Sequence, residues 1–442
     1  MKIVTGIIVL FLFLSSCSRN NSMQISGRVE NGDTIVSFWV EDSVYSFPLD
    51  ENDFFSGKIP LKHNTYATLL PYSLNVYLSP GEDLEIYVNA LNVSGSLYFR
   101  GSVGGINGYL KEQEVAVFFD KDYYTLSESA FINKMRELID EKTKLLEAKN
   151  FDGSFTKLEK QRIRYSVGER VAFYPIYQKR LNPQYRPGKV FNDFLSSFAV
   201  NNEELFGTKD YRKFLLNYVY YRGSNNYTSG ENYATGIADY ILATVNNPSV
   251  KDFLLTEIIY RHIWENNGLA GAEYLLSVFR RECSDSSKLA YIEELVDHWS
   301  KLLPGQLAPD FELTDQGGDT VRLSDFKGSN LYIAVWATWC VPCKSELPYL
   351  NLLSKEYKEK NIRFLTVAID GAADVGRWKS FLEKNDYAGI HTLAGESNKF
   401  NEKYMIISVP RFILIAPDGT IVNSNAPRPS GQIRQVLDAL EL

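Results

Sequence analysis

The 442-residue sequence contains few cysteines and few histidines, four of each. A disulfide-stapled scaffold is excluded, because such folds are rich in cysteine. Positive charge is not in excess either, since 47 Lys and Arg stand against 54 Asp and Glu, which gives a formal net charge of −7. This balance argues against nucleic acid as a partner and against a peripheral protein held by anionic lipid.

Long apolar runs are scarce, and the most prominent one follows Lys2, where residues 3–14 are mostly apolar. A bilayer-spanning helix needs about 20 such residues, so this run is too short for one. A positive start, a short apolar run and small residues are typical of an export signal. The sequence LSSC at 14–17 resembles a bacterial lipobox, which implies cleavage before Cys17 and a lipid on that cysteine.

We therefore expect a lipoprotein signal peptide over residues 1–17 and a lipid anchor at Cys17. The mature chain would then lie in the cell envelope, attached to a membrane and facing the periplasm. The alternative is an ordinary secretory signal that happens to contain a cysteine.

The rest of the sequence predicts a multidomain α+β protein. Residues 23–104 contain β-rich runs separated by turn sequences such as SPG at 79–81, which predicts a small antiparallel β domain. Residues 105–302 contain long stretches without Gly or Pro, and we expect a helical domain there. Residues 303–442 alternate predicted strands and helices, which indicates an α/β domain.

Within the helical region, apolar residues recur at helical spacing at Phe131, Met135, Leu138, Ile139 and Leu145. Three tyrosines lie close together at 218, 220 and 221. They fit either a substrate groove or the aromatic core of a helical domain, and we favour the core because half-buried Tyr is common packing material.

The C-terminal region carries the clearest local pattern. The apolar run 331–337 predicts a strand buried on both faces, followed by a helix over about 341–360 and a strand over 362–369. The sequence CVPC at 340–343 lies where the first strand turns into the helix. At a helix N-terminus, free backbone N–H groups and the helix dipole stabilise a thiolate on the first cysteine. That thiolate would attack a disulfide in a partner, and the second cysteine would resolve the mixed disulfide.

Two other uses of a C-x-x-C pair fit the sequence poorly. A zinc site needs two more ligands, and the remaining cysteines, Cys17 and Cys283, and the four histidines form no second closely spaced pair. A c-type haem attachment needs His directly after the second cysteine, where Lys344 stands instead. We therefore expect no metal and no cofactor.

The sequence WATWCVPCK at 336–344, with SVPRF at 408–412, resembles a thioredoxin-fold domain. It is similar in particular to the TlpA/ResA group of membrane-anchored thiol–disulfide oxidoreductases. The likeness covers about residues 305–442. The sequences VYLSPGE at 76–82 and FRGS at 99–102 resemble the N-terminal β domain of unknown function found in many exported thioredoxin-like lipoproteins.

The resemblance implies roles for six site residues. Cys340 and Cys343 would form the redox disulfide, with Cys340 as the exposed nucleophile and Cys343 as the buried resolving cysteine. Pro410 would be the cis-proline beside them, and the backbone of Val409 would pair with a substrate peptide. Trp339 would flank Cys340 on the contact surface.

Glu346 is the sixth residue. Cytoplasmic thioredoxins bury an Asp six residues before the first cysteine, but Ala334 occupies that position here. The TlpA/ResA group instead carries a Glu where Glu346 stands, one helical turn after Cys343. Its carboxyl group could exchange a proton with the Cys343 thiol. The alternative is a solvated first-turn Glu that the helix dipole favours.

We therefore expect an extracytoplasmic thiol–disulfide oxidoreductase that acts on protein thiols and disulfides of the envelope as a reductant, with a membrane electron donor. A peroxiredoxin shares the APDF sequence at 308–311, but its peroxidatic site needs a Pro and a Thr at set positions ahead of the cysteine. In this sequence position 333 is Ile, and Thr338 lies one residue too close to the cysteine. An alternative of another class is an envelope binding or scaffold lipoprotein whose upstream domains capture a partner. Cys283 is either a free helical thiol or a third redox partner.

Overall fold

The computed structural model describes residues 21–41, 43–116, 121–202, 205–224, 232–385, 387–395 and 399–440. The predicted signal segment 1–17, including Cys17, lies outside these ranges. Within them, no helix combines the length and the apolar composition that a membrane crossing requires. The chain divides into two compact units, Met1–Arg222 and Gly223–Leu442.

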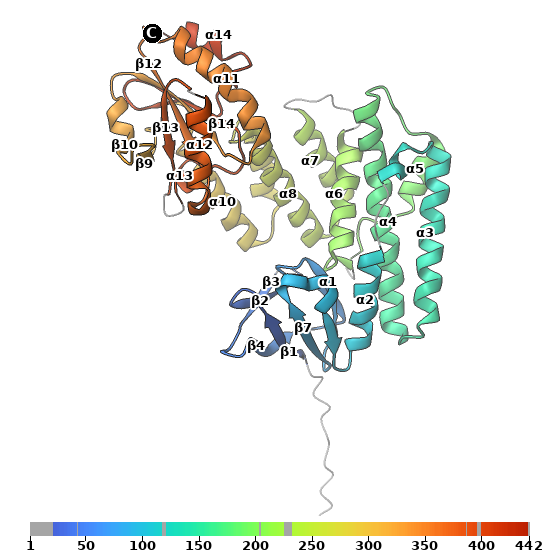
Figure 1. Ribbon diagram of the computed structural model, residues 1–442. Helices are drawn as coiled ribbons and strands as arrows, with labels where there is room; N and C mark the ends of the chain where they lie inside the picture. The colour runs from blue at the N-terminus through green and yellow to red at the C-terminus, as the bar shows by residue number, and fades with distance from the viewer. Residues whose placement is uncertain are drawn as a thin grey trace, which may run out of the picture. The chain divides into compact units, whose positions relative to one another are not determined.

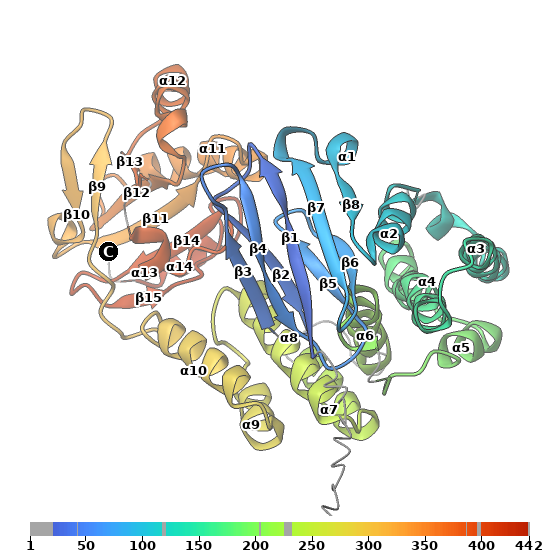
Figure 2. The ribbon, with the colours of Figure 1, turned by 90° about the horizontal axis from the view of Figure 1, so that it is seen from below.

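The first unit contains two four-stranded sheets, with strand orders β4-β1-β7-β8 and β3-β2-β5-β6 (Figure 2). Burial alternates along β1 and β7, so each strand turns one face towards the core. All pairings are antiparallel except that of β1 with β7, so the predicted antiparallel β domain contains one parallel pair. The strands are β1 Ser22–Glu30, β2 Ile35–Val40, β3 Ser43–Pro48, β4 Phe54–Pro60, β5 Thr65–Leu70, β6 Leu74–Leu78, β7 Asp83–Asn89 and β8 Tyr98–Arg100.

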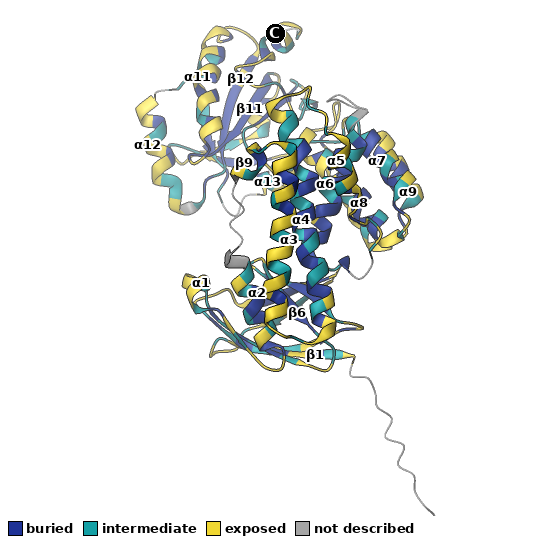
Figure 3. Cartoon of the chain, turned by 90° about the vertical axis from the view of Figure 1, so that its right-hand side faces the viewer, coloured by how far each residue is buried: buried dark blue, intermediate teal, exposed yellow. Residues whose placement is uncertain are grey.

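Helices α2 to α6 follow the strands in this unit, as the sequence predicts, whereas the short helix α1 precedes β8 (Figure 1). The longest of them, α4, has buried side chains along much of its length, and Figure 3 shows buried residues along it. The three clustered tyrosines are buried, which confirms the packing interpretation. The helices are α1 Val93–Ser96, α2 Gly104–Ala116, α3 Glu128–Ala148, α4 Gly153–Leu181, α5 Lys189–Ser196 and α6 Lys209–Gly223.

In α3 the predicted apolar face is right at its start and wrong at its end. Phe131 and Met135 are fully buried, but Leu145 is 48 % exposed and Leu146 is buried in its place. A step from 135 to 146 is close to three helical turns, whereas a step to 145 rotates the side chain about 100° away. Position 142, one turn before 146 on the same face, is half-buried.

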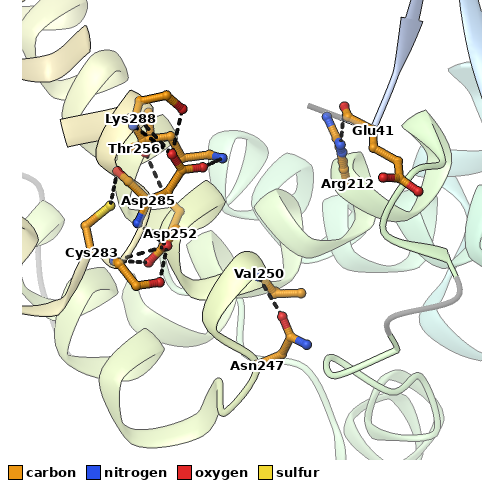
Figure 4. A network of polar contacts seen from close by, with 11 residues as sticks. Glu41, Arg212, Asn247, Val250, Asp252, Thr256, Cys283, Asp285 and Lys288 are labelled. Atoms are coloured by element: carbon orange, nitrogen blue, oxygen red, sulfur yellow. Dashed lines mark hydrogen bonds and ion pairs between the residues drawn. The ribbon is translucent and has the colours of Figure 1, made fainter. Parts of the chain in front are cut away.

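Arg212 of α6 joins the helices of the first unit to its second sheet. Its Nη2 donates to the backbone carbonyl of Glu41 at 2.6 Å (Figure 4). Its guanidinium also lies 5.3 Å from the centre of the Trp39 ring, a cation–π distance. Helices and strands of this unit thus share one packed core.

The second unit begins with helices and continues into a seven-stranded sheet of order β10-β9-β13-β12-β11-β14-β15. The helices are α7 Asn232–Thr244, α8 Pro248–Asn266, α9 Glu273–Glu282 and α10 Ser286–Ser300. The strands are β9 Glu312–Asp315, β10 Thr320–Arg322, β11 Asn330–Trp336, β12 Ile362–Ala368, β13 Ile390–Leu393, β14 Arg411–Ile415 and β15 Ile421–Asn423.

The centre of this sheet matches the prediction. Every residue of β11 is buried, and the strand pairs in parallel with β12 and antiparallel with β14 (Figure 3). The helix predicted to reach residue 360 ends earlier, at Glu356. The sheet packs against α11 Val341–Glu356, α12 Val375–Asn385 and α14 Ile433–Asp438, and the short helix α13 spans Phe400–Lys403.

Within this unit the helices α8 and α10 contact the sheet through Arg411, the first residue of β14. The guanidinium lies 5.2 Å from the ring centre of Trp299 in α10 and donates to Asn267 Oδ1, just after α8, at 3.3 Å. It also donates to the carbonyl of Ser424 at 2.6 Å. Because no carboxylate faces it in these contacts, burial lowers the pKa of Arg411 to about 10.

We expect Arg411→Ala to lower the free energy of unfolding of the second unit by about 2–4 kcal/mol. The change removes a large buried side chain and leaves its carbonyl partners without a donor. Urea unfolding of the full chain, followed by tryptophan fluorescence, measures the loss.

The matched control is Arg377→Ala. Arg377 is exposed and pairs with Asp374 at the surface, so its removal should change stability by no more than about 0.5 kcal/mol. Equal losses in the two variants would contradict a special role of Arg411.

Candidate functional site

The candidate site lies where β11 passes into α11. Cys340 is the N-cap residue of α11, and its Sγ accepts a hydrogen bond from the backbone N–H of Cys343 at 3.2 Å. Cys340 and Cys343 form a disulfide, with their Cα atoms 5.3 Å apart. Both are buried in this oxidised form, although Cys340 is the more accessible, with 5 % exposed against 1 % for Cys343. The resemblance implied a more exposed Cys340.

Hydrogen bonds from Thr338 to Asp370 fix the loop that leads to the cysteines. The backbone N–H of Thr338 donates to both carboxylate oxygens of Asp370 at 3.0 Å, and its hydroxyl donates to Asp370 Oδ1 at 2.5 Å. Asp370 is 1 % exposed and follows β12 by two residues. Sequence reasoning missed this residue, although an Asp directly after an apolar strand was a signal that could have pointed to it.

The loop before β14 lies against the disulfide. The Val409–Pro410 peptide bond is cis, the isomer that the resemblance implies. The carbonyl oxygen of Val409 lies 3.8 Å from Cys340 Sγ. This places the backbone of the loop next to the sulfur that a partner would contact.

Apolar side chains are exposed beside the disulfide. Trp339, directly before Cys340, is 60 % exposed, and Val341, directly after it, is 70 % exposed. Large apolar side chains next to a reactive group are typical of a surface that receives another protein. Trp336, by contrast, is buried in the core.

Glu346 lies on the inner side of the disulfide and is 7 % exposed. Together with Cys343 and Pro410 it lines a small cavity of about 10 Å³, roughly the size of one water molecule. The same cavity is lined by Ala334, so no carboxylate reaches it from β11. Glu346 is therefore a buried group next to Cys343 and not a solvated residue of the first turn.

Ser430 holds the Glu346 carboxylate in place. Its backbone N–H donates to Glu346 Oε2 at 3.0 Å and its hydroxyl donates to Oε1 at 2.9 Å. Arg428 Nη1 lies 4.0 Å from Oε1. Burial, and then the charge of Glu346, raises the pKa of Tyr332 on β11. Sequence reasoning did not find Ser430, because the chain between it and Glu346 carries no local signal of their contact.

Cys283 is a buried free thiol at the end of α9. Its Sγ lies 3.6 Å from the carbonyl oxygen of Asp285, and Asp252 accepts hydrogen bonds from Ser284 and Asp285 around it (Figure 4). Burial raises the pKa of this thiol, which lowers its thiolate fraction and hence its reactivity. The structure thus favours the interpretation of Cys283 as an inert thiol. In the described ranges, no group of three or more His, Cys, Asp or Glu is arranged to hold a metal.

Comparisons with known proteins agree with this site. The Redoxin family model matches residues 303–440. The thiol-disulfide oxidoreductase ResA of Bacillus thuringiensis is 33 % identical over 122 residues, which is 28 % of this chain and 69 % of the relative. ResA of Oceanobacillus iheyensis is 38 % identical over 125 residues, 26 % of this chain and 62 % of the relative. Among solved structures, a protein of Bacteroides vulgatus described as a thiol-disulfide oxidoreductase is 42 % identical in sequence. The match covers 32 % of this chain and 98 % of that chain, with a TM-score of 0.30.

The Redoxin match falls on the C-terminal part of the chain and includes the C-x-x-C pair. The first unit lies outside the Redoxin match. With a disulfide at the start of a helix and a Redoxin domain around it, the chain belongs to the ResA family of thiol–disulfide oxidoreductases.

Proposed function

We propose that this protein is an extracytoplasmic oxidoreductase that reduces disulfides of cell-envelope proteins through Cys340 and Cys343. The observation that carries the proposal is the position of the disulfide at the N-cap of α11, beside the Val409 carbonyl and between two exposed apolar side chains. The envelope location rests on the lipobox-like sequence at 14–17, and the reductant role rests on the resemblance to the TlpA/ResA group.

The first step is attack by the Cys340 thiolate. The backbone N–H of Cys343 donates towards Cys340 Sγ, and the N-terminal end of the helix dipole adds favourable potential, so both stabilise negative charge on this sulfur. Attack on one sulfur of the partner's disulfide forms a mixed disulfide, and the other partner sulfur leaves as a thiolate.

The second step releases the partner. The Cys343 thiolate attacks Cys340 Sγ, which forms the Cys340–Cys343 disulfide and frees the second partner thiol. Two electrons have then passed from the cysteine pair to the partner. An electron donor in the membrane would return two electrons and two protons to the pair before the next cycle.

Glu346 is suited to accept the proton of Cys343 before this second step. Its carboxylate and Cys343 line the same cavity, which has room for about one water molecule as a proton relay. The two hydrogen bonds from Ser430 keep the carboxylate aimed at that cavity. In the reverse direction the same group would return the proton to the thiolate.

Partner binding would use the loop before Pro410. In the described part of the chain, neither the amide nor the carbonyl of Val409 takes part in a backbone hydrogen bond, so both are available to an extended peptide. An extended segment of a partner could pair there in the manner of an added strand. Trp339 and Val341 would cover its side chains.

The redox direction is the first prediction of this proposal. In a glutathione or dithiothreitol titration of the full-length chain, the Cys340–Cys343 couple should titrate at about −270 mV, the potential of thioredoxin-like reductants. The thiols are counted by alkylation and mass spectrometry.

Cys283→Ser should give the same potential, because Cys283 is a buried free thiol outside the couple. A value at about −120 mV would identify a disulfide donor and would overturn the reductant role.

Glu346→Gln should slow thiol–disulfide exchange at neutral pH by about 10²-fold, the lower end of what general acid–base catalysis contributes. It should also remove one ionisation from the pH dependence of the rate. Stopped-flow exchange with a small aromatic disulfide measures both. Ser430→Ala should act in the same direction but more weakly, because the Ser430 amide still donates to the carboxylate.

Glu359→Gln is the matched control, since Glu359 is an exposed residue just beyond α11. An unchanged pH profile in Glu346→Gln would remove Glu346 from the mechanism, whatever the absolute rate.

Lipid attachment is tested separately. In cells supplied with labelled palmitate, the full-length chain should incorporate label, and Cys17→Ser should not. Cys283→Ser should be labelled like the parent chain. Label in the Cys17→Ser variant would rule out Cys17 as the lipidated residue.

A further inference from the structure

A polar cavity of about 430 Å³ lies within the first unit, and its lining includes no residue of the redox site. Its walls come from the β5–β6 turn, β6 and the helices α2, α3, α4 and α6. Pockets that hold small molecules in proteins commonly enclose about 300–1,000 Å³. Its size therefore suits a small molecule better than one or two water molecules.

Positive charge dominates the lining. The acidic residues that line the cavity are Glu159 and Asp210. The basic ones are Lys142, Arg162, Arg170, Lys209 and Lys213. This excess contrasts with the acidic character of the whole chain, whose formal net charge is −7.

The two acidic residues share one basic partner, Arg162. Arg162 donates to both oxygens of Glu159 at 2.7 and 2.8 Å and to Asp210 Oδ2 at 3.0 Å. The hydroxyl of Tyr66 donates to Glu159 as well. Glu159 and Arg162 are buried, so this network is fixed by packing. With five basic and two acidic residues, the lining as a whole keeps a positive formal charge.

Neighbouring groups do not cancel this excess. Glu169 and Glu141 lie outside the lining but interact with its basic groups, and counting both still leaves more basic than acidic groups. Burial, and then the charges of Arg162 and Arg170, lowers the pKa of Lys142, although Glu141 and Glu159 act against the shift. Lys142 therefore lies in the positive electrostatic potential of Arg162 and Arg170.

The remaining lining residues are mostly neutral and polar. They include Asn75, Gln113 and Ser166, whose side chains can donate or accept hydrogen bonds, whereas Ile163 is apolar. An apolar ligand would bury the charged groups of the lining without pairing with them, which is costly. A polar anion would pair with them and with the lysines and arginines.

We propose that this cavity binds a small polar molecule that carries a phosphate or sulfate group. Arg and Lys are the side chains that proteins use for such groups, through charge-assisted hydrogen bonds. Neutral hydroxyls on the rest of the molecule would contact the amide and hydroxyl side chains of the lining. This binding site belongs to the first unit and is independent of the redox function.

The test is isothermal titration calorimetry on the full-length chain with glucose 6-phosphate, inorganic phosphate, inorganic sulfate and glucose. Saturable binding of at least one of the three anions, without binding of glucose, is the expected result. Binding should weaken as NaCl is added, because charge supplies part of the affinity. A preference for glucose 6-phosphate over inorganic phosphate would point to a phosphorylated metabolite, and equal binding would point to the free anion.

Lys142→Met and Lys213→Met should each weaken binding about tenfold. Lys144→Met is the matched control, since Lys144 is an exposed residue on α3, the helix of Lys142, and does not line the cavity. Circular dichroism and thiol–disulfide exchange establish that each variant is folded.

No saturable binding of any of the three anions at millimolar concentration would overturn the proposal. So would an equal loss of binding in Lys144→Met and Lys142→Met. A chain that bound the anion but lacked redox activity would leave this proposal intact and would contradict the proposed function instead.

Discussion

The redox site depends on the hydrogen bonds between Thr338 and Asp370. The buried carboxylate of Asp370, just after β12, accepts hydrogen bonds from the backbone N–H and the hydroxyl of Thr338. Thr338 is the second residue after β11. This ties the turn between β11 and α11 to the neighbouring strand. Cys340 is the N-cap of α11. Its sulfur can accept the hydrogen bond from the Cys343 amide only if this turn keeps its backbone conformation.

The sequence predicted those features of the fold and site that depend on residues close together in the chain. The buried strand β11, the start of α11 and the cysteine pair follow from residues adjacent in the sequence. The partners that position the site could not be predicted this way, because Thr338 and Asp370 are 32 residues apart, Glu346 and Ser430 are 84 apart, and Asn267 and Arg411 are 144 apart. Such contacts are set by the fold as a whole, and a single sequence does not encode them as a short pattern.

Contacts between distant residues also explain why the three regions that differ in composition do not coincide with the two compact units. Composition changes near residues 104 and 302, where strands give way to helices and helices to an α/β pattern, and domain boundaries there stay a prediction. Packing instead groups α7–α10 with the C-terminal sheet and α2–α6 with the β strands. Secondary-structure class reflects propensity, whereas a unit is defined by which apolar faces cover one another.

Arg411 directly follows Pro410 in the chain, and its guanidinium lies on Trp299 and donates to Asn267. The peptide segment next to the disulfide is therefore fastened to the end of α8 and to α10. A fragment that began at residue 303 would keep every residue of the Redoxin match and yet lose both of these partners. In such a fragment the Arg411 guanidinium would contact water where it now contacts the indole ring of Trp299. The start of the Redoxin match therefore separates Arg411 from two of its partners, although Arg411 is next to the cis-proline of the site.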